Sequence, residues 1–295
     1  MDLALIVIAV LVVVALIFDF TNGFHDAANS VGTVVATRAL PAKWAPAFSA
    51  FFNFLALFVV GTAVASTVGK TVKAEFASEA VIFAGLFAAI AWNYITWYIG
   101  MPSSSSHAII GGLVGAGLAA GGLGAISWSS VQRAAIGIIA SPLVAFTIAF
   151  VLMYIVFLVQ KIFKLHDDHP SFKGLQLVSA AALSFGHGAN DAQKTMGVIG
   201  ALLLGAGYTT MDEAGKNIIL PMWVEIAAYS AIALGTLWGG WKIIETMGLR
   251  ITTLHANSGA AANIGASTAI FGATAMGAPI STTQAAASSV VGAGV

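Results

Sequence analysis

Long stretches of this chain contain no aspartate, glutamate, lysine or arginine. The two longest run from Ala80 to Gln132 and from Ile251 to Val295, and shorter ones run from Trp44 to Gly69 and from Ala134 to Val159. About 20 apolar residues are enough for an α-helix to cross a bilayer. Inside a bilayer, backbone polar groups must be paired within the chain, which leaves only helices or a closed barrel.

The runs are continuously apolar, whereas the strands of an outer-membrane barrel alternate polar and apolar residues. The chain of 295 residues is 59% apolar and only 8% charged, against about 25% charged residues in a typical soluble domain. We therefore predict an all-α polytopic membrane protein. The helices are expected at about 3–22, 45–68, 80–100, 133–162, 218–242 and 258–277.

The charge and motif content excludes several classes of protein. Twelve basic and twelve acidic residues give a net charge of zero, so binding of nucleic acid has no electrostatic basis. The absence of cysteine excludes disulfides and thiol chemistry. No Walker motif, nucleotide fingerprint, metalloprotease motif or nucleophile–base pair is visible. We predict that the chain is not an enzyme and holds no cofactor.

Two polar, glycine-containing segments each occur twice. Residues 20–32 (FTNGFHDAANSVG) return as residues 185–197 (FGHGANDAQKTMG), and residues 102–108 (PSSSSHA) return as residues 279–285 (PISTTQA). Duplicated interruptions of hydrophobic segments, at matching positions of two halves, point to the binding site of a transporter.

The polar connector at residues 161–173 lies between the two copies. We therefore predict a first repeat at residues 1–165 and a second at residues 174–295. The first half continues beyond its serine segment into a long apolar run, so the repeat predicts a further closing helix after Val295. The Gly- and Ser-rich segments are expected to form broken or re-entrant helices, which are tolerated at membrane depth when buried in protein; they lie around 23–37, 103–122, 175–207 and 280–295.

The proline-and-serine segments suit the start of a helix. Proline is favoured in the first turn, where its missing N–H costs nothing, and serines can cap free backbone N–H groups or help them to hold an anion. A half-helix from Pro102 would direct its positive dipole end and several hydroxyls at one point, and the segment from Pro279 offers the same. One such segment is most simply a serine-capped loop; two matching copies favour a shared oxyanion site.

Asp26 and Asp191 are the acidic residues of the other repeated segment. Ionisable residues in apolar membrane segments are costly and by default functional. A bare carboxylate would repel an anion, so a cation or a proton is the better partner, which is the chemistry of ion coupling. Asn29 follows Asp26 at helical spacing and could add an oxygen ligand. Lys194 replaces Asn29 in the second copy, either as an ion-pair partner of Asp191 or as a substrate contact.

Histidines and lone amides are interpreted as structural. The histidines match no established zinc spacing, so we predict hydrogen-bonding roles and no metal site, with metal ligation as the alternative; they are His25, His107 and His187. The lone amides within the spans are expected to form interhelical hydrogen bonds; they are Asn53, Asn93 and Asn263.

These segments resemble the duplicated signatures of the inorganic phosphate transporter family, which includes bacterial low-affinity phosphate permeases and mammalian type III sodium–phosphate cotransporters. The family signature G-x-N-D-x-A-N-S is similar to residues 23–30 and 188–195, and its P-x-S-x-x-H element is similar to residues 102–107 and 279–284. The four elements occur in the family's order, and the resemblance extends from the first helix to Val295.

The resemblance implies ion-driven uptake of inorganic phosphate by a multi-pass protein of the cytoplasmic (cell) membrane, built from two inverted repeats and assembled as a homodimer. In that family the duplicated aspartates are linked to the coupling cation and the Ser/Thr-rich tips to phosphate. The coupling-cation residues would be Asp26, Asn29, Asn190 and Asp191. The phosphate-binding residues would be Ser103, Ser104, Ser105, Ser106, Ser281, Thr282, Thr283 and Gln284.

Three positions depart from the family pattern. His25 replaces an asparagine beside the first aspartate, Gln193 and Lys194 replace Ala-Asn in the second copy, and Asn263 stands where eukaryotic relatives carry glutamate. These departures leave coupling to a proton (H+) or to Na+ open, as well as carriage of a neutral metal–phosphate complex. A divalent-metal transporter would take up metal without phosphate, and a passive anion channel would need no cation gradient.

Overall fold

The computed structural model describes residues 3–295, and these are almost entirely helical. In chain order the α-helices are α1 (Leu3–Ala36), α2 (Ala45–Leu55), α3 (Ala63–Gly69), α4 (Glu79–Tyr98), α5 (Ser105–Gly121), α6 (Trp128–Phe163), α7 (Pro170–Gly205), α8 (Met222–Trp238), α9 (Trp241–Glu245), α10 (Ala256–Ala275) and α11 (Thr282–Gly294). The short helices are η1 (Ala56–Phe58), η2 (Ala74–Phe76), η3 (Gly122–Ala125) and the π-helix η4 (Thr246–Arg250).

Several helices are long and apolar enough to cross a membrane. Among the described residues these are α1, α4, α6 and the segment Ser105–Ala125. The segment Ala45–Phe58 (α2 and η1) and the helix α3 make a fifth span if this bent pair is counted as one. This last segment bends by 91° between Phe58 and Ala63, so the single helix expected at residues 45–68 is broken. The multi-pass helical architecture predicted from the apolar runs is confirmed.

Two of the expected breaks do not occur. The sequence predicted interrupted helices around residues 23–37 and 175–207, but α1 and α7 continue through both regions. The glycines there serve close packing between helices, and their polar neighbours are buried in protein, so neither forces the backbone to open. The interruptions expected around residues 103–122 and 280–295 are present, before α5 and α11, whose first residues are Ser105 and Thr282.

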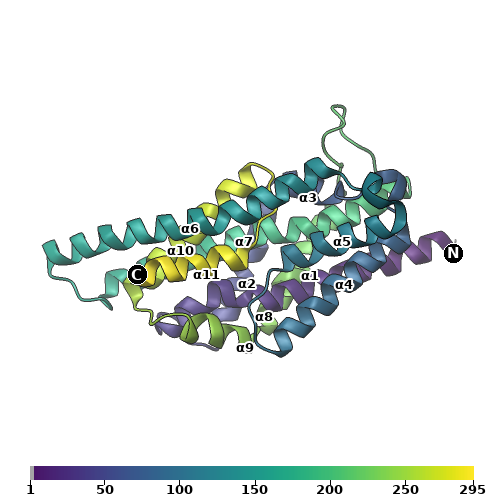
Figure 1. The fold of residues 1–295 in the computed structure, drawn as a ribbon. Helices are drawn as coiled ribbons and strands as arrows, with labels where there is room; N and C mark the ends of the chain where they lie inside the picture. Colours follow the sequence, from purple (N-terminus) through teal and green to yellow (C-terminus); the bar gives the residue numbers. More distant parts are fainter. Residues whose placement is uncertain (1–2) are drawn as a thin grey trace.

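The helices that carry the two matching aspartate segments make comparable packing contacts. α1 and α7 carry the matching aspartate segments and run in opposite directions (Figure 1). A Cβ atom on Gly23 of α1 would lie 2.2 Å from the carbonyl oxygen of Ile232 in α8, and one on Gly188 of α7 would lie 2.3 Å from that of Asn53 in α2. Both α1 and α7 therefore make a close helix crossing through the equivalent glycine, α1 with α8 and α7 with α2. Small residues permit such close approach in membrane proteins.

The interior contains two main apolar clusters. One gathers the first part of α1, α3, α4, the end of α7 and α8 around Phe18 and Leu86. The other gathers the end of α1, the first part of α7, α9, α10 and α11 around Ile244 and Ile270. Both α1 and α7 pass from one cluster to the other close to their aspartates, so the polar segments lie where the two clusters meet.

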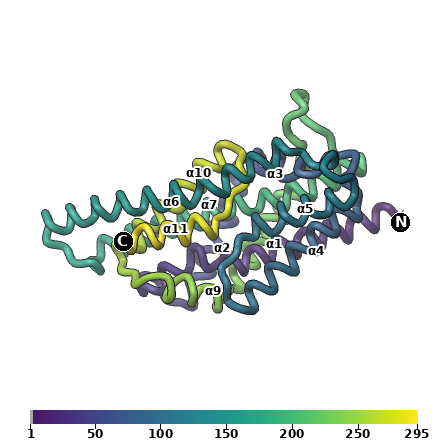
Figure 2. The backbone as a smooth tube through the Cα atoms, viewed as in Figure 1, coloured from purple at the N-terminus to yellow at the C-terminus, as the bar shows by residue number. Residues whose placement is uncertain are grey.

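The two polar connectors that flank α7 lie at opposite ends of the bundle. Residues 164–169 join α6 to α7 at one end, and residues 206–221 project from the other (Figure 2). At the first end, the Asp168 carboxylate accepts a hydrogen bond from the backbone N–H of Ala256, at 3.1 Å, and so binds the first turn of α10. This bond lowers the pKa of Asp168, because it stabilises the ionised carboxylate.

Candidate functional site

The two serine- and threonine-rich segments form the N-termini of α5 and α11, as the sequence predicted. Ser104 is the N-cap of α5 and accepts a hydrogen bond from the backbone N–H of His107, at 3.2 Å. Ser281 is the N-cap of α11 and accepts one from Gln284, at 3.1 Å. Because their side chains cap the helices, these two residues position the tips. The hydroxyls available for other contacts belong to the residues that follow them.

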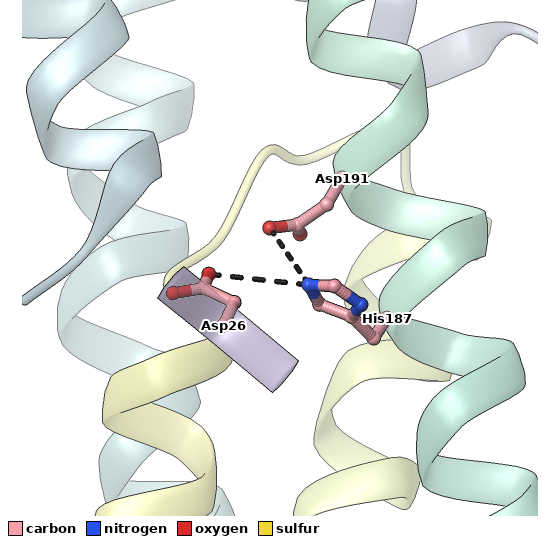
Figure 3. Close-up of side chains that lie close together, drawn as sticks. All are labelled: Asp26, His187 and Asp191. Atoms are coloured by element: carbon pink, nitrogen blue, oxygen red, sulfur yellow. Dashed lines mark ion pairs between the residues drawn. The ribbon is translucent and has the colours of Figure 1, made fainter. Parts of the chain in front are cut away.

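Asp26 and Asp191 meet from different helices, although they are far apart in the sequence. Asp26 lies on α1 and Asp191 on α7, and both side chains are buried. His187 stands between them: its Nε2 atom is 3.6 Å from Asp191 Oδ2 and 4.0 Å from Asp26 Oδ2 (Figure 3). Ligand atoms from the three residues lie within 4.8 Å of one another, which is close enough for one ion to contact all three.

The start of α11 closes this group. The Thr283 hydroxyl donates to Asp26 Oδ1 at 3.0 Å. The Thr282 hydroxyl lies 3.3 Å from Asp26 Oδ2 and 3.3 Å from Asp191 Oδ2, and so stands between the two carboxylates. The predicted anion-binding tip and the predicted cation-binding carboxylates are therefore one site. We call these residues, with His187, Lys194 and Asn29, the central cluster.

Lys194 is an ion-pair partner. Its Nζ atom lies 2.6 Å from Asp191 Oδ1 and also donates to the Ser106 hydroxyl and, at 3.1 Å, to the carbonyl oxygen of Ile280. The side chain is completely buried. This arrangement favours the ion-pair role among the two left open by the sequence, because the ammonium is held within the protein by a carboxylate and two further oxygens.

The hydrogen bonds around His187 place a hydrogen on its Nδ1 atom. The Thr236 hydroxyl donates to a backbone carbonyl, so its oxygen accepts from Asn53 Nδ2 at 2.8 Å. Asn53 therefore turns its Oδ1 atom toward His187 Nδ1, at 3.3 Å, and Nδ1 must supply the hydrogen. A neutral imidazole has one N–H, so in that form Nε2 would present its lone pair toward the two carboxylates, and in the imidazolium form it would donate to them. In the neutral form, three electron-donating atoms would face one another, an arrangement that suits a cation.

The two predicted asparagines make different contacts. Asn29 donates to the Thr283 hydroxyl at 3.3 Å, and its Oδ1 atom is buried with no hydrogen-bond partner among residues 3–295. Asn190 makes two hydrogen bonds through its amide group. It donates to Thr274 of α10 at 2.9 Å and accepts from the N–H of Ile280, in the segment before α11, at 3.3 Å. Asn29 therefore has an oxygen free for a ligand, and Asn190 holds the α11 tip in place.

The remaining serines divide between the cluster and an open cavity. Ser105 is buried at the start of α5, and its hydroxyl has no hydrogen-bond partner among the described residues. Ser103 accepts from the Trp92 indole at 2.8 Å and lies outside the cluster, beside a cavity of about 780 Å³. Gln284 also lines this cavity, as does Thr283, which touches Asp26. The cavity thus extends from the surface to the edge of the central cluster.

The charges of the central cluster do not cancel. Two carboxylates stand against one ammonium, so with neutral imidazoles the group carries net negative charge. The N-termini of α5 and α11 add partial positive charge beside it. An anion would meet repulsion from the carboxylates here unless a further cation entered with it.

Comparisons with known proteins agree with this architecture. The sequence profile PHO4, described as the phosphate transporter family, matches residues 22–166 and 159–295.

The chain belongs to the phosphate transporter family.

Similar relatives are described as probable low-affinity inorganic phosphate transporters. That of Rhizobium meliloti (strain 1021) is 46% identical over 288 residues, covering 96% of this chain and 84% of the relative. That of Bacillus subtilis (strain 168) is 42% identical over 297 residues, covering 100% of this chain and 87% of the relative. The low-affinity inorganic phosphate transporter PitB of Escherichia coli (strain K12) is 32% identical over 237 residues, covering 69% of this chain and 48% of PitB.

A solved structure described as the sodium-dependent phosphate transporter has the same fold. It is 24% identical, has a TM-score of 0.85, and covers 97% of this chain and 88% of that chain. The protein is therefore a multi-pass cell-membrane protein of a transporter family and not an enzyme.

The structure places in the candidate site one residue for which the sequence predicted a structural role. His187 was interpreted as structural, but it completes the group with the two aspartates; its spacing of four residues from Asp191, one helical turn, is the signal that could have indicated this. The interhelical roles predicted for the lone amides are confirmed for Asn53, Asn93 and Asn263, which bond across α2–α8, α4–α1 and α10–α1.

Proposed function

We propose that this member of the phosphate transporter family is a secondary active transporter, which takes up inorganic phosphate using the gradient of a cation, either sodium or protons. The observation that carries the proposal is the shared position of the two kinds of site. The Thr282 hydroxyl at the tip of α11 lies 3.3 Å from both Asp26 and Asp191, and Lys194 joins the Ser106 hydroxyl at the tip of α5 to Asp191. Because the carboxylates repel an anion, phosphate binds favourably only together with a cation, which is the requirement for coupling.

The phosphate group would be held by the hydroxyls of Ser105 and Thr282 and by the N-termini of α5 and α11. These are the two equivalent positions of the repeated segment, and helix N-termini bind phosphate through free N–H groups and the helix dipole. The Ser105 hydroxyl is buried without a partner, so it has its hydrogen bond available. The coupling cation would bind Asp26 and Asn29, with Asp191 and His187 facing it.

The two halves would exchange access to the site by moving against each other. The opposite directions of α1 and α7 support an inverted repeat, in which equivalent elements enter the membrane from opposite sides (Figure 1). Inverted repeats commonly place the substrate at their interface and rock about it. A homodimer remains our prediction for the assembly.

The test is uptake of labelled phosphate into proteoliposomes under a sodium gradient and, separately, under a pH gradient. Accumulation driven by one gradient would support the proposal and identify the coupling ion. Asp26→Asn should abolish gradient-driven accumulation, because the amide removes the negative charge that attracts the cation. Asp212→Asn is the matched control, since that carboxylate lies in the exposed connector before α8. Uptake that needs no gradient would contradict the proposal and indicate a channel.

A second candidate is supported by the triad of Asp26, His187 and Asp191. Two carboxylates and an imidazole are suitable ligands for a divalent metal, so the carried species could be a neutral metal–phosphate complex. In that case phosphate uptake would require a divalent cation, and radioactive metal would enter in parallel with phosphate. His187→Gln should then abolish metal uptake, whereas coupling to sodium alone would leave phosphate uptake insensitive to chelators.

A further inference from the structure

The ammonium of Lys194 has the surroundings of a bound metal cation. It is completely buried, and its neighbours are a carboxylate oxygen of Asp191 at 2.6 Å, the Ser106 hydroxyl and the carbonyl oxygen of Ile280 at 3.1 Å. A buried charge is tolerated only when it is paired and hydrogen-bonded. One carboxylate, one hydroxyl and one carbonyl are also the oxygen donors that bind hard cations in proteins.

The repeat shows what the ammonium replaces. Aligning the two copies pairs Lys194 with Asn29, Asp191 with Asp26, and Ser106 with Thr283. In the first copy, the Thr283 hydroxyl donates directly to Asp26 Oδ1 at 3.0 Å. In the second copy, the Lys194 ammonium contacts both Asp191 and Ser106 and so joins the equivalent pair. The lysine therefore supplies positive charge at the position between carboxylate and hydroxyl.

The first copy has no lysine beside its aspartate; the titratable group in contact with Asp26 is His25, whose Nδ1 atom lies 3.0 Å from Asp26 Oδ1. Asn29 Oδ1 is buried and has no hydrogen-bond partner in the described chain, while its Nδ2 atom lies 3.3 Å from the Thr283 hydroxyl that also bonds Asp26. An amide oxygen left unpaired in a buried site is costly. A cation bound to Asp26 would supply its missing partner.

We propose that Lys194 is a built-in cation, which occupies the cation position of the second repeat, so that one mobile cation accompanies phosphate and binds at Asp26 and Asn29. A chain with an amide at both equivalent positions would hold two. This inference rests on the proposed coupled transport and adds its stoichiometry. With Lys194 present and with His25 and His187 neutral, one mobile cation balances the two carboxylates; without Lys194, two are needed.

The experiment counts cations against phosphate in proteoliposomes. Labelled sodium uptake, or alkalinisation of the outside medium if protons are the coupling ion, is divided by labelled phosphate uptake. Lys194→Asn should take up one more cation per phosphate than the wild type. Protons carried by phosphate itself contribute equally in both proteins and so do not affect this difference. Lys194→Met is the matched control, because it removes the charge without providing an oxygen ligand; it should lose uptake. A merely structural ion pair would lower uptake in both variants without changing the ratio.

A converse variant keeps the inference testable if Lys194→Asn fails to fold. Asn29→Lys should place a second ammonium beside Asp26, so that phosphate exchange continues while gradient-driven accumulation is lost. Three results would overturn the inference alone: two sodium ions per phosphate in the wild type, an unchanged ratio in an active Lys194→Asn protein, or loss of coupling in that protein with exchange retained. Absence of any gradient-driven uptake by the wild type would instead overturn the proposed function.

Discussion

Replacing Gly235 by alanine should push α8 away from α1, the helix that carries the first aspartate segment. Gly235 lies on α8 where that helix crosses α1, and a Cβ atom there would lie 2.1 Å from the carbonyl oxygen of Phe20. Real Cβ atoms essentially never come closer than 3.0 Å to such an atom, so the backbones must move apart by about 0.9 Å. The contact is with backbone on a rigid helix, and no side-chain rotation can relieve it.

The expected cost follows from this displacement. Overpacking of a well-packed interior costs about 1–3 kcal/mol, and the intrinsic preference of a helix for alanine over glycine returns only about 1 kcal/mol. Gly272→Ala is the matched control, because Gly272 is also within a helix and a Cβ atom there would meet nothing within 4 Å. We expect a lower midpoint of thermal unfolding for Gly235→Ala and an equal or slightly higher one for Gly272→Ala.

Transport should also respond, because the crossing lies one helical turn from the central cluster. Gly23 faces α8 in the same crossing and is three residues before Asp26, whose carboxylate is 3.0 Å from the Thr283 hydroxyl. A misplacement on the order of 1 Å in a binding site can cost about 100-fold in rate, so initial phosphate uptake should fall at least about tenfold in Gly235→Ala. Equal melting midpoints and equal uptake in the two variants would refute the close crossing of α1 and α8.

Three further outcomes follow from named contacts. Asp191→Asn should cost about 3–5 kcal/mol of stability, because it leaves the buried Lys194 ammonium unpaired; adding Lys194→Met should recover most of the loss in thermal unfolding, and no recovery would contradict the pairing. Ser105→Ala with Thr282→Val should raise the half-saturation concentration for phosphate roughly 30-fold, since each of the two hydroxyls is worth about 1 kcal/mol and about 1.4 kcal/mol is a factor of ten; an unchanged value would exclude them from the anion site. The lowered pKa of Asp168 means that its bond to the first N–H of α10 stabilises the fold above pH ~4 and is lost as the pH falls through the lowered pKa. The melting midpoint of the wild type should therefore fall in acid more than that of Asp168→Asn, and parallel curves would contradict this role.

The amino-acid sequence determined the class and the helical architecture, and it identified candidate residues for the site. Runs without charge leave a chain in a bilayer no alternative to helices, and duplicated polar segments can be identified without any coordinates. The half-helices at Ser105 and Thr282 were predictable for the same reason, because proline and serine act locally on the first turn of a helix.

Only the tertiary structure decided where helices break and which polar groups meet. Glycines in α1 and α7 could have signalled either a break or a close crossing, and the difference lies in the partner helix, which local sequence does not specify. The same holds for Lys194: spacing allowed a contact with Asp191, but burial beside Ser106 and Ile280 depends on the packing of α5 and α11 against α7. Contacts between distant helices are not specified by local sequence. The duplicated segments therefore indicated where a site could form, and the packing of the helices determined which charged side chains meet there.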